Sequence, residues 1–313
     1  MDRRVIHLAE VLFRLAERLL PIPLLLLVVW PAAMLMGRRH VLRRASLSRL
    51  RRLPATLKPC EARWRWLWRV WFGRSAVYTT RVLSFWPDRL REDRWGRRCR
   101  FIGLERLEAP LAEGRPVILA TLHYGDLTML YHWLRSRGIA AAFLAAPRRK
   151  QTPEFRGSLD LLADRVNGLD GVPHLIYLDQ LWDAQDFLGR PGRVLAIAMD
   201  GNTKRDVAVN GPEYTFYVSP GALRLAAIVG AVVIPCLISS PGCLRSTIRF
   251  GFPVADGDVA NRDRHPIACE HIVRELVPWI TQRPEECGIG LLSAFGPPSM
   301  PVSETHALSQ QPE

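Results

Sequence analysis

The sequence lacks the short motifs that mark most nucleotide-dependent, zinc-dependent and serine-dependent enzymes. It has no P-loop, no G-x-G-x-x-G fingerprint, no G-x-S-x-G nucleophile elbow, no H-E-x-x-H motif and no internal repeat. The six cysteines are scattered, and the two nearest, Cys236 and Cys243, are seven positions apart, so no pair has metal-ligand spacing. We therefore expect no metal and no cofactor, and thiols that are free and mostly buried.

Acidic residues are scarce in the first third of the chain. Residues 1–100 contain 23 Lys and Arg against 7 Asp and Glu, a net charge of +16, whereas residues 101–313 contain 20 against 23, a net charge of −3. A basic block suits nucleic acid or an anionic membrane surface. Its apolar neighbours favour the membrane surface, and a membrane-tethered nucleic-acid binder is the weaker interpretation.

An uncharged apolar run occupies residues 19–36. Its eighteen residues reach the lower limit for spanning a bilayer, although its three prolines disfavour a regular spanning helix. Leucines at helical spacing before the run predict an amphipathic interfacial helix. The arginine cluster after it places the rest of the chain in the cytoplasm, and no convincing cleavage site supports a signal peptide. Residues 1–55 are thus predicted to be a membrane-anchoring segment with a basic flank.

Aromatic residues and arginines alternate between residues 55 and 100. Trp64, Trp68 and Trp71 fall near one face of a predicted helix, together with Val77. We favour packing of that face on the domain. The alternative is an interface belt, with tryptophan at headgroup depth and arginine on lipid phosphates. The same composition also suits single-stranded nucleic acid, an option that the preceding apolar segment weakens.

From residue 101 onward, apolar runs alternate with amphipathic segments. This alternation predicts an α/β fold with a mostly parallel sheet covered by helices on both faces. We place the α/β domain at residues 56–295 and expect a disordered tail over 296–313. The predicted strands are 116–122, 139–145, 173–178, 193–199, 231–238 and 245–254, and the predicted helices are 126–137, 153–167, 179–188, 219–229 and 266–281.

His123 is the most informative residue of the chain. It follows the apolar run 117–122 and precedes Gly125 and Asp126, which begin a predicted helix. Open α/β sheets bind their ligands at this kind of strand-to-helix junction. An imidazole there is able to take and return a proton near neutral pH. The alternative is a loop histidine without a role.

Blocks of sequence around this junction occur in a recognisable order. Gly114–Leu119 leads into the histidine, and the strand–His–helix arrangement with these blocks resembles the lysophospholipid acyltransferase superfamily. Within it, the chain is most similar to the bacterial lipid A biosynthesis acyltransferases, over most of its length. The other blocks are Leu20-Pro21-Ile22-Pro23, Gly103-Leu104-Glu105, Pro220–Ala226 with Gly230–Pro235, and Pro284-Glu285-Glu286-Cys287.

The resemblance implies an O-acyltransferase on the cytoplasmic face of a bacterial inner membrane. It implies transfer of a fatty acyl group from acyl carrier protein or coenzyme A to a hydroxyl of a lipid or glycolipid, with no nucleic-acid partner. In that scheme His123 takes the proton of the acceptor hydroxyl, and an apolar groove holds the acyl chain.

One position departs from the family pattern. The family has Asp or Glu at the fifth position after the histidine, where this sequence has Thr128, and Asp126 is the only nearby carboxylate. We take Asp126 as the catalytic partner of His123, although Asp there is also a typical helix N-cap. Asp200, which ends the predicted strand 193–199 at the same sheet edge, is a second possibility. The third is a weakened or inactive relative that binds lipid as a scaffold.

Polar and cationic residues after two other predicted strands are candidates for substrate binding. Their chemistry suits an acceptor phosphate, the donor pantetheine or an acidic carrier protein, whereas a plain turn and a solvated loop are the alternatives. His174, His265 and His271 are interpreted as structural, and His132 is expected on the exposed side of its helix, without a role. The substrate-binding candidates are Asp200, Gly201, Lys204 and Arg205 in one group, Arg148 and Arg149 in the other, and Arg165, which matches the family's arginine region loosely.

Overall fold

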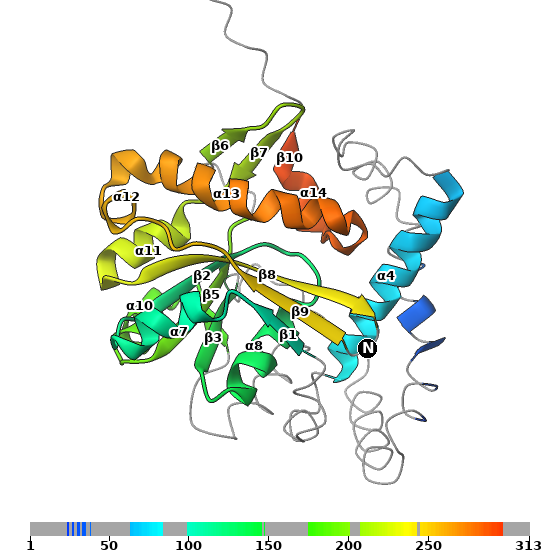
Figure 1. Ribbon diagram of the computed structural model, residues 1–313, viewed down its shortest axis with the longest axis horizontal. Coiled ribbons are helices and arrows are strands. Elements are labelled where there is room, and N and C mark those ends of the chain that lie inside the picture. The colour runs from blue at the N-terminus through cyan, green and yellow to red at the C-terminus, as the bar shows by residue number, and fades with distance from the viewer. Residues whose placement is uncertain are drawn as a thin grey trace, which may run out of the picture.

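A seven-stranded sheet forms the centre of the computed structural model (Figure 1). The strand order is β1-β9-β8-β2-β5-β3-β4, and the five strands from β8 to β4 run parallel. β9 is antiparallel to β8, and β1 is parallel to β9. The strands are β1 (Cys99–Ile102), β2 (Val117–Thr121), β3 (Ala140–Ala145), β4 (Leu175–Tyr177), β5 (Arg193–Ala198), β8 (Val232–Gly242) and β9 (Arg245–Phe250).

The structure describes most of the chain after residue 62. The described residues are 63–83, 99–145, 147, 175–200, 207–242 and 245–296, with Leu24, Leu27, Trp30, Pro31, Ala33–Leu35 and Arg38 before them. Several predictions fall outside these residues: the helix 153–167, most of the anchor, and the tail from residue 297 onward, whereas Gly296 belongs to a strand. Cys60, Cys243 and His174 also lie outside them.

Helices cover both faces of the sheet. Strand β2 shows why: all five of its residues are buried, so its apolar side chains need a cover on each side. Ile118 and Ala120 belong to a core cluster with helices on one face, whereas Val117 and Leu119 belong to a cluster with helices on the other. The first face carries α10 (Leu181–Leu188), α11 (Gly221–Val229), α13 (His265–Gln282) and α14 (Ile289–Ala294), and the second carries α7 (Glu105–Ala112) and α8 (Leu127–Ser136).

A second, three-stranded antiparallel sheet was not expected from the sequence. It contains β6 (Val207–Asn210), β7 (Thr215–Val218) and β10 (Phe295–Gly296). The Phe216 and Phe295 rings pack at 4.6 Å between centroids, which joins the end of the described chain to this sheet. Strands this short carry too few residues for a clear alternation, so the pattern gave no prediction. Short α12 (Asp256–Ala260) and helix α7 were also not predicted.

The predicted fold class is confirmed as α/β with a mostly parallel sheet and helices on both faces. The elements that were predicted differ from the observed ranges by a few residues at their ends, whereas β1 and α14 were not predicted. The prediction that His132 lies on an exposed side of its helix is wrong, because the residue is buried. The four described cysteines are free and buried, as expected, and burial raises the pKa of the Cys269 thiol to about 12.

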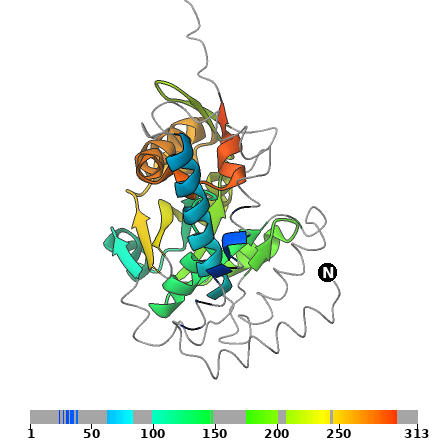
Figure 2. The same ribbon diagram turned by 90° about the vertical axis from the view of Figure 1, so that its right-hand side faces the viewer.

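Helix α4 (Arg63–Leu83) lies outside these layers, at the edge where the parallel strands end. It contacts the end of β8 and the short helix η4 (Pro284–Glu286). Figure 2 shows α4 along one side of the molecule, with the described positions of the N-terminal region beside it. Trp71 Nε1 donates a hydrogen bond of 2.8 Å to the Met34 carbonyl oxygen there. Among the described residues, no helix is long and apolar enough to cross a bilayer.

Candidate functional site

His123 and Asp200 come together because β2 and β5 are neighbours in the sheet. The two strands pair in parallel, with Thr121 opposite Ala198, and each candidate follows its strand by two residues. The pairing continues past the strand ends, since Met199 N donates a 2.8 Å hydrogen bond to the Thr121 carbonyl oxygen. Parallel register therefore brings two residues 77 positions apart to one point of the carboxyl edge.

The carboxylate of Asp200 makes two contacts with His123. Its Oδ1 accepts a 3.0 Å hydrogen bond from the His123 backbone N–H and lies 2.8 Å from the ring Nδ1. The Asp200 side chain is completely buried, whereas the His123 side chain is 55% exposed. An ionised carboxylate accepts but does not donate, so in this contact Nδ1 carries the hydrogen and the ring lone pair is on Nε2.

At this point the connections that follow the two strands lead to opposite faces of the sheet. Helix α8 follows β2 on one face, and α11 follows β5 on the opposite face after the small sheet. The crevice between two such strands is the usual ligand site of open α/β sheets. The location predicted for His123 is therefore the location in the structure.

Asp126 has a different environment. Its carbonyl oxygen accepts the first backbone hydrogen bond of α8, 3.0 Å from Met129 N, which is the N-cap position. Its side chain is completely buried. The carboxylate hydrogen-bonded to the His123 ring is Asp200, the remote acid among the possibilities drawn from the sequence. A catalytic role for Asp126 stays a prediction.

The backbone of residues 283–288 holds the loop from His123 to Gly125. Gly288 N donates 2.7 Å to the His123 carbonyl oxygen, and Gly125 N donates 3.1 Å to the Glu286 carbonyl oxygen. The Tyr124 hydroxyl donates 3.0 Å to the Arg283 carbonyl oxygen. These contacts were not predicted, although residues 284–287 had been singled out as a block. Sequence order alone does not show that they meet the loop 160 positions earlier.

Gly125 is the residue of this loop that admits no side chain. Its φ is +58°, and an added Cβ would clash with the Ile238 carbonyl oxygen. Gly138 has a similar φ of +75° with nothing within 4 Å, so it is a matched control. The left-handed conformation alone costs an alanine about 1–2 kcal/mol. We expect Gly125→Ala to lower the free energy of unfolding clearly more than Gly138→Ala does, as measured by urea denaturation. Equal losses would contradict the close approach to β8.

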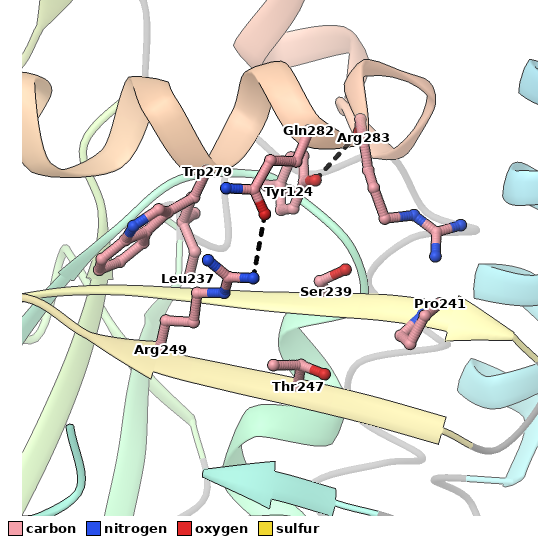
Figure 3. A pocket seen from close by; sticks show the side chains of 9 residues that line it. All are labelled: Tyr124, Leu237, Ser239, Pro241, Thr247, Arg249, Trp279, Gln282 and Arg283. Atoms are coloured by element: carbon pink, nitrogen blue, oxygen red, sulfur yellow. Dashed lines mark hydrogen bonds between the residues drawn. The ribbon is translucent and has the colours of Figure 1, made fainter. Parts of the chain in front are cut away.

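A pocket of about 120 Å³ lies between α13 and the strands β8 and β9 (Figure 3). Tyr124 contributes to its wall, but His123 does not. It is not the apolar groove expected beside the histidine, because two arginines and several polar side chains line it. The lining residues are Tyr124, Leu237, Ser239, Pro241, Thr247, Arg249, Trp279, Gln282 and Arg283.

The other predicted site residues are not placed. Thr128 is a position of α8, but its side chain lies outside the described part of the structure. No group of three or more His, Cys, Asp or Glu that could hold a metal occurs among the described residues. His265 and His271 bond to backbone carbonyl oxygens, which fits a structural role. The predicted substrate-binding residues outside the described ranges are Arg148, Arg149, Arg165, Gly201, Lys204 and Arg205.

Comparison with protein-family models and with curated proteins finds no match for this chain. The resemblance to acyltransferases therefore rests on the quoted sequence blocks, and the functional argument rests on the geometry of the site.

Proposed function

We propose that the protein is an O-acyltransferase that moves a fatty acyl group from a thioester of acyl carrier protein or coenzyme A to a hydroxyl of a lipid or glycolipid. The observation that carries the proposal is the exposed His123 ring bonded through Nδ1 to the buried Asp200, at the carboxyl edge of a parallel sheet. A histidine held in this way is equipped to act as a general base toward a bound hydroxyl.

The reaction needs one proton acceptor and no redox chemistry. His123 Nε2 takes the proton of the acceptor hydroxyl while its oxygen attacks the thioester carbonyl carbon. The tetrahedral intermediate then collapses, the carbon–sulfur bond breaks, and the imidazolium returns the proton to the leaving thiolate. The products are an ester and a free thiol. Asp200 supports each step because it orients the ring and offsets the positive charge that develops on it.

The outer surface of α4 supports a lipid acceptor. The predicted packing of Trp64, Trp68 and Trp71 on the domain is right for Trp71, which contacts the main core cluster, and wrong for Trp64 and Trp68, which are exposed. Trp64 is 60% exposed, and Trp68 and Phe72 are 45% exposed. The Trp68 and Phe72 rings stack at 5.5 Å, with exposed Arg65 beside Trp64. Exposed aromatics with arginines suit a membrane interface.

This aromatic surface lies at the edge of the sheet that carries His123. Arg69 of α4 forms an ion pair of 3.1 Å with Glu285, within the segment whose backbone holds the His123 loop. A bilayer against the aromatic surface would therefore bring lipid hydroxyl groups to the same edge. The acyl thioester donor and the bacterial inner membrane are the parts of the proposal that come from the family resemblance, whereas the cytoplasmic position also follows from the arginine cluster after residue 36.

Replacing the three exposed aromatics together, Trp64→Ala, Trp68→Ala and Phe72→Ala, is expected to weaken binding to anionic lipid vesicles. A fully buried side chain of this size contributes about 1.5–3 kcal/mol, and partial insertion of three would leave about a 10–100-fold loss. Vesicle co-sedimentation measures the binding. Trp182→Ala is the matched control, because Trp182 is 82% exposed on α10, which Figure 1 shows far from α4. Equal losses in both variants would contradict an interface on α4.

The direct test of the function measures both products. Purified full-length protein in detergent micelles is mixed with an acyl thioester and a lysophospholipid or deacylated glycolipid acceptor. Thiol release and the mass of the acylated lipid should rise together and should depend on the acceptor. Lipid binding without thiol release would favour a non-catalytic scaffold instead. Lipid profiles of cells with and without the gene then identify the acceptor class as the one that loses an acyl chain.

A further inference from the structure

The segment from Arg283 to Gly288 sets the position of the His123 loop through its backbone. It contributes two carbonyl oxygens and one N–H to the loop, at Arg283, Glu286 and Gly288. Backbone groups move only with the segment that carries them. Whatever fixes this segment therefore also fixes the carbonyl and amide groups that surround the catalytic histidine.

Glu286 is the residue that fixes this segment on the sheet. Its side chain is completely buried, and both carboxylate oxygens are engaged by β8. Oε2 accepts a 2.6 Å hydrogen bond from Ser240 N, and Oε1 accepts a 3.0 Å hydrogen bond from the Ser239 hydroxyl. Arg283 Nε lies 2.7 Å from Oε1 as an ion pair whose geometry falls short of a hydrogen bond.

The amide of Ser240 is available to Glu286 because the β8–β9 ladder is irregular there. Ser239 pairs with Thr247 and Gly242 with Arg245, and the register shifts between them. A bulge of this kind releases backbone groups from the ladder and often lies beside functional sites. A buried amide needs a partner, so removal of the carboxylate would leave Ser240 N unsatisfied.

Strand β8 is the neighbour of β2, the strand that leads to His123. The carboxylate also lies against the loop itself, since a Cβ built on Gly125 would be 3.2 Å from Glu286 Oε2. Burial raises the pKa of the Glu286 carboxyl, while Arg283 and the hydrogen bonds from β8 act in the opposite direction. The site thus keeps a buried carboxylate, whose desolvation costs free energy that a purely apolar contact would not cost.

We propose that Glu286 is a positioning residue for His123: its carboxylate anchors residues 283–288 to the irregular end of β8, and the backbone of that segment holds the imidazole against Asp200. The inference rests on the proposed function for its catalytic consequence. Its geometric consequence, the tautomer and orientation of the His123 ring, does not depend on that function.

Glu285 provides the matched control. It belongs to the same segment and is also buried, but its carboxylate pairs with Arg69 at 3.1 Å and Arg283 at 3.3 Å. Among the described residues, no hydrogen bond or ion pair joins its carboxylate to β8 or to the His123 loop. A general loss of stability in this segment should affect both glutamates, whereas a positioning role should belong to Glu286.

The experiment compares full-length Glu286→Ala, Glu286→Gln and Glu285→Gln. For Glu286→Ala we expect kcat to fall about 10–100-fold with little change in KM, as for other groups that orient a catalytic residue. Glu286→Gln keeps one acceptor oxygen and should lie between wild type and alanine. Glu285→Gln should keep the wild-type kcat.

Nitrogen-15 NMR of histidine-labelled protein supplies the second readout. Wild-type His123 should show hydrogen on Nδ1, and Glu286→Ala should show a mixture of the two tautomers. Should Glu286→Ala fail to fold, Glu286→Gln carries the same comparison. A folded Glu286 variant with wild-type kcat and an unchanged His123 tautomer overturns the proposal. Absence of thioester transfer in wild type overturns the proposed function instead, and the tautomer measurement still decides the role of Glu286.

Discussion

Replacing His123 by alanine is expected to lower kcat for acyl transfer by about 10²–10⁴-fold, the usual contribution of a general base. The His123 side chain is largely exposed, so its removal leaves no cavity in the core and should change the free energy of unfolding little. KM for the thioester should stay close to the wild-type value, since the lost interaction is made in the transition state. Steady-state kinetics of thiol release give both constants.

The control for this change is His271→Ala. His271 is partly exposed and belongs to α13, which covers the face of the sheet opposite α8, and its Nε2 contacts the Phe252 carbonyl oxygen. It should keep wild-type kinetics. If the His123→Ala protein remains folded and transfers acyl groups at the wild-type rate, His123 is not the general base.

The position of His123 was predictable because it depends on local sequence. A continuous apolar run ends at residue 122 and an amphipathic helix begins at residue 127, so the residue between them must lie at a strand-to-helix junction. The same logic placed Asp200 after another buried strand. Both predictions use only the rule that parallel strands end at a common edge.

The pairing of His123 with Asp200 was not decided by sequence. Asp126 is three residues from the histidine, and proximity along the chain favoured it. The structure places β2 next to β5, and this strand order brings a residue 77 positions away into hydrogen-bond contact. Strand order follows from the packing of helices on both faces of the sheet, and no local sequence pattern predicts it. Asp126 meanwhile occupies the helix N-cap that its sequence context also allowed.

The orientation of α4 was also not predictable from the local sequence pattern, because it depends on packing. The helix has aromatic residues on more than one side, so periodicity does not say which side is buried. In the structure, Leu67, Val70 and Trp71 contact the core, and Trp64, Trp68 and Phe72 face outward. Close contact with Glu285 fixes this orientation, since a Cβ on Gly73 would lie 2.9 Å from Glu285 Cγ.

Replacing Asp200 by asparagine is expected to lower kcat by about 10²–10⁴-fold, nearly as much as removal of His123. The amide has almost the same shape, but a single atom, Asp200 Oδ1, faces both the His123 backbone N–H and the ring Nδ1. An NH₂ group in its place therefore also removes the acceptor of the backbone N–H. The negative charge of the carboxylate is lost. An amide NH₂ turned toward Nδ1 stabilises the tautomer that carries its hydrogen on Nε2, and in that tautomer Nε2 is unable to accept a proton from the substrate. The imidazolium formed during reaction also loses its counter-charge.

The order of effects among three variants tests which carboxylate serves His123. We expect Asp200→Asn to lose far more activity than Asp126→Asn, because the Asp200 carboxylate lies 2.8 Å from the ring Nδ1 of His123. Thr128→Ala should have the smallest effect, since a hydroxyl supplies no negative charge to an imidazolium. The reverse order, with Asp126→Asn inactive and Asp200→Asn active, would indicate that Asp126 is the acidic partner of His123. Because all three changes are nearly isosteric or small, unfolding curves of the variants should separate lost catalysis from lost structure.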